Sequence, residues 1–162
     1  AEIRIPRSLA AFATGAALAL AGVLMQVLLR NPLADPYILG LSGGAAVAAL
    51  ACITLGFAGA WLSSAALLGA LVSVFLVFSI AGRAGHWSTI RLLLTGVVLS
   101  AGWGALINLM LATSASASVQ GMLFWLMGDL SQSRTGWLQW FVLFVGAAAA
   151  LSQARSLNVL VR

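Results

Sequence analysis

The chain has 162 residues, of which 62% are hydrophobic and 7% charged, and its mean hydropathy is +1.09. Soluble domains are only about 45–50% apolar, so this composition excludes an ordinary soluble domain and indicates a membrane protein. Three acidic residues stand against eight arginines. The arginines lie at the borders of apolar stretches, as at membrane interfaces. They do not form the basic clusters on a polar surface that nucleic-acid binding requires.

Uncharged stretches predict the membrane-spanning helices. The stretch between Arg7 and Arg30 is long enough to cross the roughly 30 Å hydrocarbon core as one helix. Residues 36–80 are uncharged over about twice that length, and the glycine-rich sequence at 56–60 is the natural turn between two spans. The predicted spans are about 8–29, 37–55, 61–80, 90–111 and 137–151.

A short sixth helix is predicted over about 118–128, between the last two spans. Its apolar stretch is too short to cross the membrane, which is typical of a re-entrant, periplasmic or interfacial helix. We expect Trp125 and Met127 to pack it against the bundle. Ser88 or Thr89 stands where a hydroxyl can cap the first free amides of the 90–111 helix.

The arginines also predict the orientation. Assigning successive loops to alternate sides places five arginines on one side and three on the other, and the positive-inside bias puts the larger group in the cytoplasm. The larger group is Arg30, Arg83, Arg91, Arg155 and Arg162, and the smaller is Arg4, Arg7 and Arg134.

Small residues recur in the predicted spans and favour close helix packing in lipid. They include Gly15, Ala19, Gly22, Gly40, Gly44, Gly102 and Gly104.

The single cysteine and the single histidine do not indicate a metal site, because such a site needs several converging donors. We expect Cys52 to be a small core residue and His86 to be a solvated side chain on the cytoplasmic edge. The chain begins AEIRIPR, without methionine, and we expect it to be a piece of a longer protein.

Several motifs in order resemble one known family. The stretch RIPRSLAAFATGAALALAGVLMQVLLRNPLADPYILGLSGGAA, followed by STIRLLLTGVVLS, GMLFWLMGDL and RSLNVL, is similar to the permease subunits of ATP-driven importers for ferric siderophores, haem and cobalamin. The resemblance covers the whole chain but only about half of such a subunit. It implies an all-α polytopic membrane bundle, equivalent to the second to sixth of about ten helices.

The resemblance also implies the partners and the location. Family permeases form a homodimer with the pathway at the shared interface in the bacterial inner membrane, two ATPase subunits bind below, and a substrate-binding protein docks from the periplasm. The chain would therefore be neither an enzyme nor a cofactor carrier. It contains no G-x-x-x-x-G-K-[ST] phosphate loop, so ATP hydrolysis would belong to the separate subunit.

The family's docking and gate residues have counterparts in two motifs. Arg4 and Arg7 of RIPR would accept acidic residues of the binding protein, or only anchor the helix end among lipid headgroups. Asn31 and Leu33 of RNPLADP would narrow the cytoplasmic exit. Without the resemblance, an ordinary turn containing asparagine and proline would be the preferred interpretation of that loop, and the resemblance reverses that preference.

Two further sets complete the implied site. Ser88 and Thr89 match the hydroxyl pair of the same gate, although a helix cap would explain them as well. Thr95, Ser100 and Asn108 are candidates for lining the pathway, but their spacing does not fall on one helical stripe.

Other functions stay open from the sequence. A different small-solute transporter or a channel would explain the spans but not the ordered motifs, and a structural fragment without transport of its own is a further alternative. Intramembrane catalysis needs ionisable groups at membrane depth, whereas every charged residue here lies at a predicted border or loop.

Overall fold

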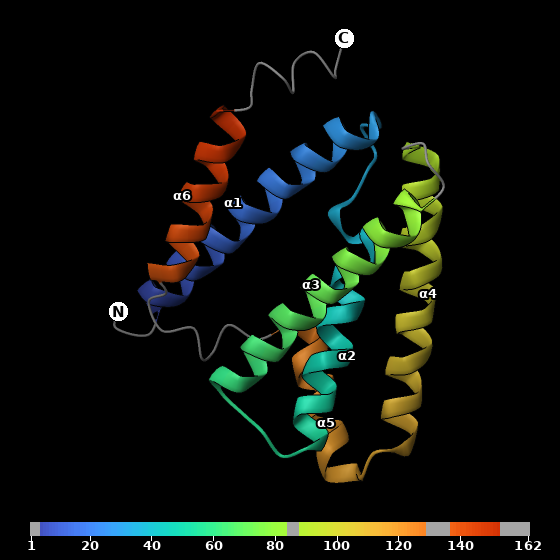
Figure 1. Ribbon diagram of the computed structural model, residues 1–162. Coiled ribbons are helices and arrows are strands. Elements are labelled where there is room, and N and C mark those ends of the chain that lie inside the picture. Colours follow the sequence, from blue (N-terminus) through green and yellow to red (C-terminus); the bar gives the residue numbers. More distant parts are fainter. Residues whose placement is uncertain (1–3, 84–87, 129–136, 153–162) are drawn as a thin grey trace. The chain divides into compact units, whose positions relative to one another are not determined.

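The computed structural model describes residues 4–83, 88–128 and 137–152, with the backbone alone for 137–139. Over these ranges the chain is helical and contains no strand, which confirms the predicted all-α class. Contacts divide the chain into two compact units, one of Ala1–Pro36 with Asp129–Arg162 and one of Tyr37–Gly128 (Figure 1). His86, Arg134 and the RSLNVL motif lie outside the described residues.

The first unit pairs α1 (Arg4–Leu29) with α6 (Trp137–Ser152). The ring of Phe12 stacks on Trp140 with centroids 6.1 Å apart, and Leu20 lies against Gly146 further along both helices. Because the contacts advance in the same direction along the two helices, α1 and α6 run parallel. The predicted assignment of loops to alternate sides requires this orientation for the first and fifth spans.

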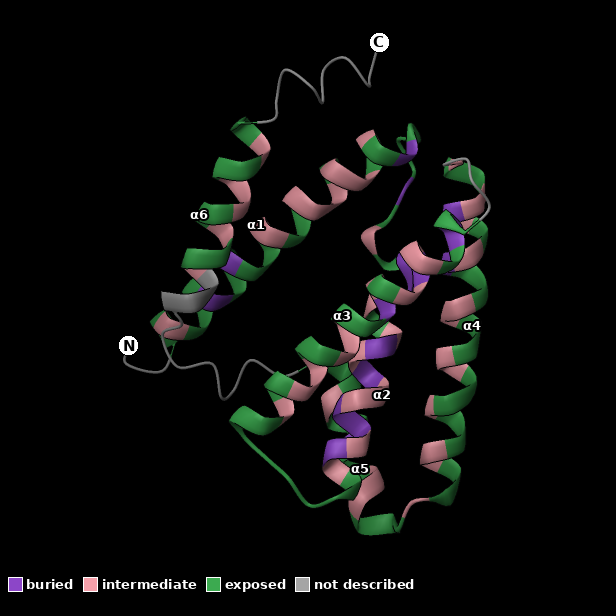
Figure 2. Cartoon of the chain, viewed as in Figure 1, coloured by how far each residue is buried: buried purple, intermediate pink, exposed green. Residues whose placement is uncertain are grey.

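The second unit is built around α2 (Leu41–Thr54), which packs against α3 (Ala60–Gly82), α4 (Thr89–Thr113) and α5 (Ser116–Met127). Figure 2 shows the buried residues of this unit gathered along α2. The buried residues of α2 are mostly small: Gly44, Ala46, Ala49, Leu50 and Cys52. This confirms Cys52 as a core residue. Small side chains let neighbouring helices approach α2 closely.

Two contacts between backbones in this unit leave no room for a side chain. A Cβ added at Gly44 would lie 2.5 Å from the carbonyl oxygen of Gly69, and a Cβ added at Gly69 would collide with the carbonyl of Gly44 in turn. A Cβ at Gly96 would collide in the same way with the carbonyl of Ile38. The backbones of α2 and α3, and of α4 and the segment before α2, therefore touch directly.

The predicted helix over 37–55 is wrong at its start. Residues Pro36–Leu39 form a 3-10 turn, Gly40 adopts a left-handed conformation with φ of 70°, and α2 begins only at Leu41. Glycine is the residue that takes this backbone conformation without steric cost. The remaining helix of 14 residues is about 21 Å long at 1.5 Å per residue, shorter than one membrane crossing.

The other boundaries follow the prediction more closely. The helices α1, α3 and α4 are long and apolar enough to cross a membrane. The turn predicted at 56–60 is present, with positive φ at Gly56 and Gly59. The first helix starts at Arg4, not at Ser8, because a proline such as Pro6 is tolerated within the first helical turn.

The packing of α5 and of several glycines also differs from expectation. Met122 is fully buried, whereas Met127 is 72% exposed, so Met122 and not Met127 holds α5 to the unit. Gly44 is a close-packing glycine as predicted. Four other glycines that were predicted to pack closely have no atom within 4 Å of an added Cβ: Gly15, Gly22, Gly102 and Gly104.

The glycine contacts give a paired test. Replacing Gly69→Ala should lower the free energy of unfolding by about 2–3 kcal/mol, because the new methyl group meets a rigid backbone carbonyl. Replacing Gly102→Ala, where space is open, should leave it unchanged or raise it by up to about 1 kcal/mol through helix propensity. Unfolding in mixed detergent micelles, followed by circular dichroism, measures both. Equal effects of the two substitutions would contradict the close contact.

Candidate functional site

The loop after α1 is held by short-range hydrogen bonds. Arg30 adopts a positive φ of 49°, and the amides of Arg30 and Asn31 donate to the carbonyls of Val27 and Gln26 at 3.2 Å and 3.1 Å. Paired bonds of this kind, with a left-handed residue at the helix end, form a Schellman motif. Arg30 occupies the position that glycine usually takes in this motif. Because a left-handed residue cannot continue the α-helix, the helix ends at Leu29.

Asn31 organises the rest of this loop. Its side-chain oxygen accepts the amide of Leu33 at 2.9 Å, and its carbonyl accepts the amide of Ala34 at 3.0 Å. Ala34 is thereby buried at 5% exposure, while Leu33 is left 87% exposed. The loop is the local turn expected of Asn and Pro, and that turn presents one large apolar side chain outward.

Ser88 and Thr89 stand at the start of α4. Ser88 occupies the N-cap position with an extended backbone, and its carbonyl accepts the amide of Leu92 at 3.0 Å. Its side chain makes no capping hydrogen bond, so the predicted hydroxyl cap is wrong. Thr89 is the first residue of α4 and is exposed.

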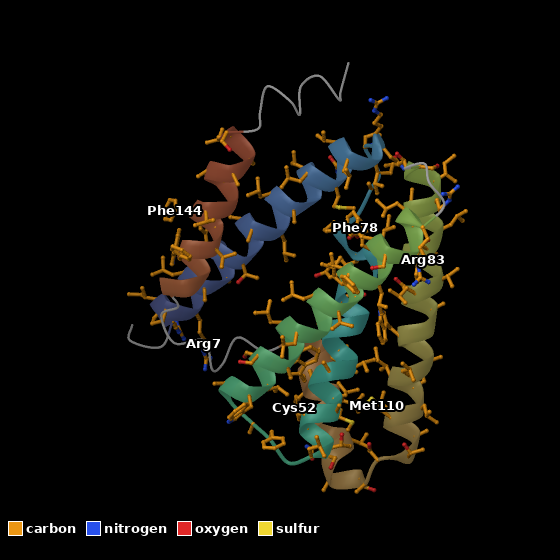
Figure 3. All side chains as sticks on the ribbon, viewed as in Figure 1. Arg7, Cys52, Phe78, Arg83, Met110 and Phe144 are labelled. Atoms are coloured by element: carbon orange, nitrogen blue, oxygen red, sulfur yellow. The ribbon has the colours of Figure 1, made fainter. Side chains whose placement is uncertain are left out.

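Arg4 and Arg7 lie in the first two turns of α1. Both are exposed, and residues three apart share one face of a helix. Figure 3 labels Arg7 at this end of α1. The two guanidinium groups therefore belong to one face at the start of the helix, which suits the pairing of arginine with carboxylates.

The three candidate pathway residues of α4 face different surroundings. Ser100 donates to the carbonyl of Gly96 at 2.8 Å and lies against Gly40, so it faces the packed side of α4. Thr95 lies in a groove between α3 and α4. Asn108 is exposed. The structure does not bring the three side chains together.

A hydrogen-bonded cluster that the sequence did not predict joins three segments of the second unit. Ser73 of α3 is fully buried; its hydroxyl donates to the carbonyl of Gly40 at 2.8 Å and accepts the indole N–H of Trp103 at 3.0 Å. The Gly40 carbonyl also accepts the amide of Gly44 at 3.1 Å. We call Gly40, Ser73 and Trp103 the Ser73 clasp.

The Ser73 clasp fixes the turn before α2 against α3 and α4. The Ser73 hydroxyl hydrogen-bonds both to the Gly40 carbonyl and to the Trp103 indole N–H. Burying any of these polar groups without a hydrogen bond would lower the stability of the fold. A Cβ at Gly40 would lie 3.1 Å from the Ser100 hydroxyl, so the site accepts only glycine without rearrangement. One weak signal for this cluster was present in the sequence, a serine in the apolar middle of α3, and the three other serines of the same helix gave a similar signal.

Two open grooves indent the second unit. One of about 460 Å³ lies among α2, α4 and α5, where Tyr37 and Trp125 form part of its walls. The other, of about 310 Å³, is lined by Ile80, Leu94, Thr95, Val98 and Leu99. Both are walled mainly by apolar side chains, and no group of three potential metal ligands occurs within the described ranges.

The comparison with protein families decides the classification. The model of the FecCD transport family matches residues 1–161. The chain belongs to this family.

Curated relatives and a solved structure extend this assignment. The FecCD chain is 40% identical over 161 residues to the cobalamin import system permease protein BtuC of Halobacterium salinarum, covering 98% of this chain and 43% of that protein. It is 43% identical over 130 residues to the vitamin B12 import system permease protein BtuC of Klebsiella pneumoniae, covering 78% of this chain and 39% of that protein.

The fold is similar to that of a metal-chelate type ABC transporter solved in an inward-facing conformation. The TM-score is 0.87 at 32% identity, with 99% of this FecCD chain and 52% of the solved chain covered. The chain therefore spans about half the length of the relatives it matches. It is a polytopic membrane protein of the ABC transporter permease class.

The Ser73 clasp gives a second test. Replacing Ser73→Ala should lower the free energy of unfolding by about 1–2 kcal/mol, because the indole N–H of Trp103 loses its acceptor inside the unit. Trp103→Phe, which keeps an aromatic ring but removes the donor, should act in the same direction. The measurement is denaturation in mixed micelles.

Ser64 is the matched control on the same helix. It is exposed and donates only to the carbonyl of Ala60, four residues earlier, so Ser64→Ala should change stability by less than about 0.5 kcal/mol. If Ser64→Ala lowered the free energy of unfolding as much as Ser73→Ala, the effect at Ser73 would be that of replacing any serine in this helix, and the clasp would add no stability of its own.

Proposed function

We propose that this FecCD family chain is part of the permease subunit of an ATP-driven importer that carries cobalamin, a ferric siderophore or haem across the bacterial inner membrane. The observation that carries the proposal is the match of 98% of the chain to a permease named for cobalamin import and of 78% of it to one named for vitamin B12 import. The likeness to a metal-chelate type transporter supports the wider substrate class. The activity is that of a longer subunit, of which this chain spans about half.

The pathway in this proposal forms between two copies of the subunit and is lined by α4. The exposed residues Ala101, Ala105, Asn108 and Ala112 recur at the spacing of one helical face. This face is small and weakly polar, which suits the passage of a bulky complex without tight binding. Thr95 belongs to the groove on another side of α4 and Ser100 to the packed side, so Asn108 is the lining residue we retain.

The cytoplasmic gate in this proposal consists of Asn31 and Leu33 with Ser88 and Thr89. The turn fixed by Asn31 holds Leu33 outward at 87% exposure, and an apolar side chain held in this way can close a narrow exit. The hydroxyl of Ser88 makes no capping bond to its own helix. It is therefore available to a partner across a closed seam.

The remaining partners supply energy and substrate. ATP hydrolysis belongs to separate cytoplasmic ATPase subunits, and a periplasmic binding protein docks on Arg4 and Arg7. The shared face of these arginines favours bidentate contacts with carboxylates.

Replacing both Arg4 and Arg7 with glutamate should weaken capture of the binding protein in a pull-down at low salt, whereas Arg30→Glu should not. Equal capture by all variants would limit Arg4 and Arg7 to anchoring the helix.

Cysteine crosslinking tests the gate. In the full-length permease assembled with its ATPase, with Cys52→Ser as background, Leu33→Cys should crosslink between the two copies. The yield should change at least about twofold between nucleotide-free and ATP-trapped states, because the gate opens and closes as α-helical bodies move. Oxidation in native membranes followed by non-reducing electrophoresis gives the yield.

Leu28→Cys provides the matched control. Leu28 is exposed at the end of α1, only five residues from Leu33, but it belongs to the helix and not to the turn. Its crosslinking should be weaker and independent of nucleotide. If Leu33→Cys also fails to crosslink in every state in an assembled complex, the loop is an ordinary turn away from the seam.

A further inference from the structure

One face of α3 carries large apolar side chains along most of its length. Trp61, Leu68 and Phe75 recur at a spacing of about two helical turns, so they share one face of the helix. Their side chains are 71%, 63% and 70% exposed. The opposite face carries Gly69 and Ser73, which contact α2 and α4. We call Trp61, Leu68 and Phe75 the outer stripe of α3, because it faces away from the rest of the second unit.

The outer stripe begins in an aromatic pair beside the turn between α2 and α3. The amides of Gly56 and Phe57 donate to the carbonyls of Ile53 and Cys52 at 2.9 Å and 3.0 Å, which is the bond pattern of a Schellman motif. These bonds fix the backbone that carries Phe57. The ring of Phe57 lies 6.2 Å from that of Trp61 between centroids, and both side chains are more than half exposed.

The length of α3 matches the thickness of a bilayer. The helix is long and apolar enough to cross a membrane, and its hydrocarbon core is about 30 Å thick. Trp61 lies in the first turn and Arg83 follows the last residue; Figure 3 labels Arg83 at this end of α3. The two residues are separated by about 33 Å at 1.5 Å per residue. Tryptophan and arginine are both typical of membrane interfaces, so the ends of α3 fit the two surfaces of one bilayer.

The size of its side chains distinguishes the outer stripe from surfaces where membrane helices pack on each other. Helix interfaces in lipid are rich in small residues that let backbones approach, as Gly44 and Gly69 do on the inner side of α3. Large side chains hold a neighbouring helix at a distance, whereas acyl chains adapt to such a surface and are as apolar as leucine. Residues 37–82 contain no charged side chain. The stripe therefore complements hydrocarbon, and its aromatic end complements the headgroup level.

We propose that the outer stripe is a lipid-facing surface of the assembled permease. Leu68 and Phe75 contact acyl chains, while Trp61 and Phe57 lie among the headgroups of the leaflet opposite Arg83. The turn between α2 and α3 is then an anchor that sets the depth of both helices in the bilayer. This surface continues the apolar exterior of a membrane-crossing helix. It holds or fails independently of the transported substrate and of the proposed gate.

Photolabelling of the full-length permease in liposomes tests this surface without any substitution. One phosphatidylcholine probe carries a diazirine at the end of an acyl chain and another carries it in the headgroup, and peptide mass spectrometry locates the adducts. The acyl-chain probe should label Leu68 and Phe75, and the headgroup probe should label Phe57 and Trp61. Val77 on the inner side of the same helix is fully buried. It is the matched control and should receive no adduct from either probe.

The substitution Trp61→Phe gives an independent measure of depth. The tryptophan emission that this variant loses should be quenched more strongly by lipids brominated near the glycerol than by lipids brominated at the chain end. Trp103 donates its indole N–H to Ser73 within the unit. The emission lost in Trp103→Phe should therefore be less sensitive to both lipids. Circular dichroism verifies that each variant folds.

Three results would overturn the proposal. In the first, Leu68 and Phe75 of the assembled permease receive no more adducts than Val77, which would mean that protein covers the stripe. In the second, Phe75→Cys forms a disulfide between two copies in a Cys52→Ser background, which would assign the cover to a second copy. In the third, Trp61 emission is quenched by iodide in the aqueous phase but by neither brominated lipid, which would exclude the headgroup anchor.

Discussion

The direct contact between the backbones of α2 and α3 at Gly44 and Gly69 is the constraint on which the second unit depends. In lipid there is little hydrophobic drive between helices, so association relies on close packing and hydrogen bonds. Removing two Cβ atoms brings the helices close enough for the Ser73 hydroxyl to reach the carbonyl of Gly40. Trp103 then extends the same bond network to α4. The close packing at Gly44 therefore places Ser73 where its hydroxyl makes both hydrogen bonds.

This arrangement has a consequence for the proposed transport function. The left-handed turn at Gly40 ends the 3-10 segment that follows the RNPLADP loop, and the Ser73 clasp holds that turn to α3 and α4. The loop that presents Leu33 in the proposed gate is therefore followed in the sequence by a turn that is fixed within the second unit.

For the part of the chain that the structure describes, the sequence predicted the number and order of the helices, because charge and its absence mark membrane borders directly. It could not predict the break at Gly40, since a glycine in an apolar run has the same appearance whether it packs a helix or turns the chain. The Ser73 clasp was missed because its members are separated by about thirty residues and no local pattern joins them. The motif RNPLADP did predict a turn, and the hydrogen bond from Asn31 explains why Leu33 is exposed. The roles of Arg4, Arg7 and Asn108 in transport stay predictions.

The most direct test of the proposed function is uptake into membrane vesicles that contain the complete permease with its ATPase. Labelled cobalamin, ferric siderophore and haem would each be supplied with their binding proteins, in the presence and absence of ATP. An ATP-driven importer should accumulate one of these substrates only when both ATP and the matching binding protein are present. Accumulation that follows an ion gradient without ATP, or that needs no binding protein, would contradict the assignment to an ATP-driven importer.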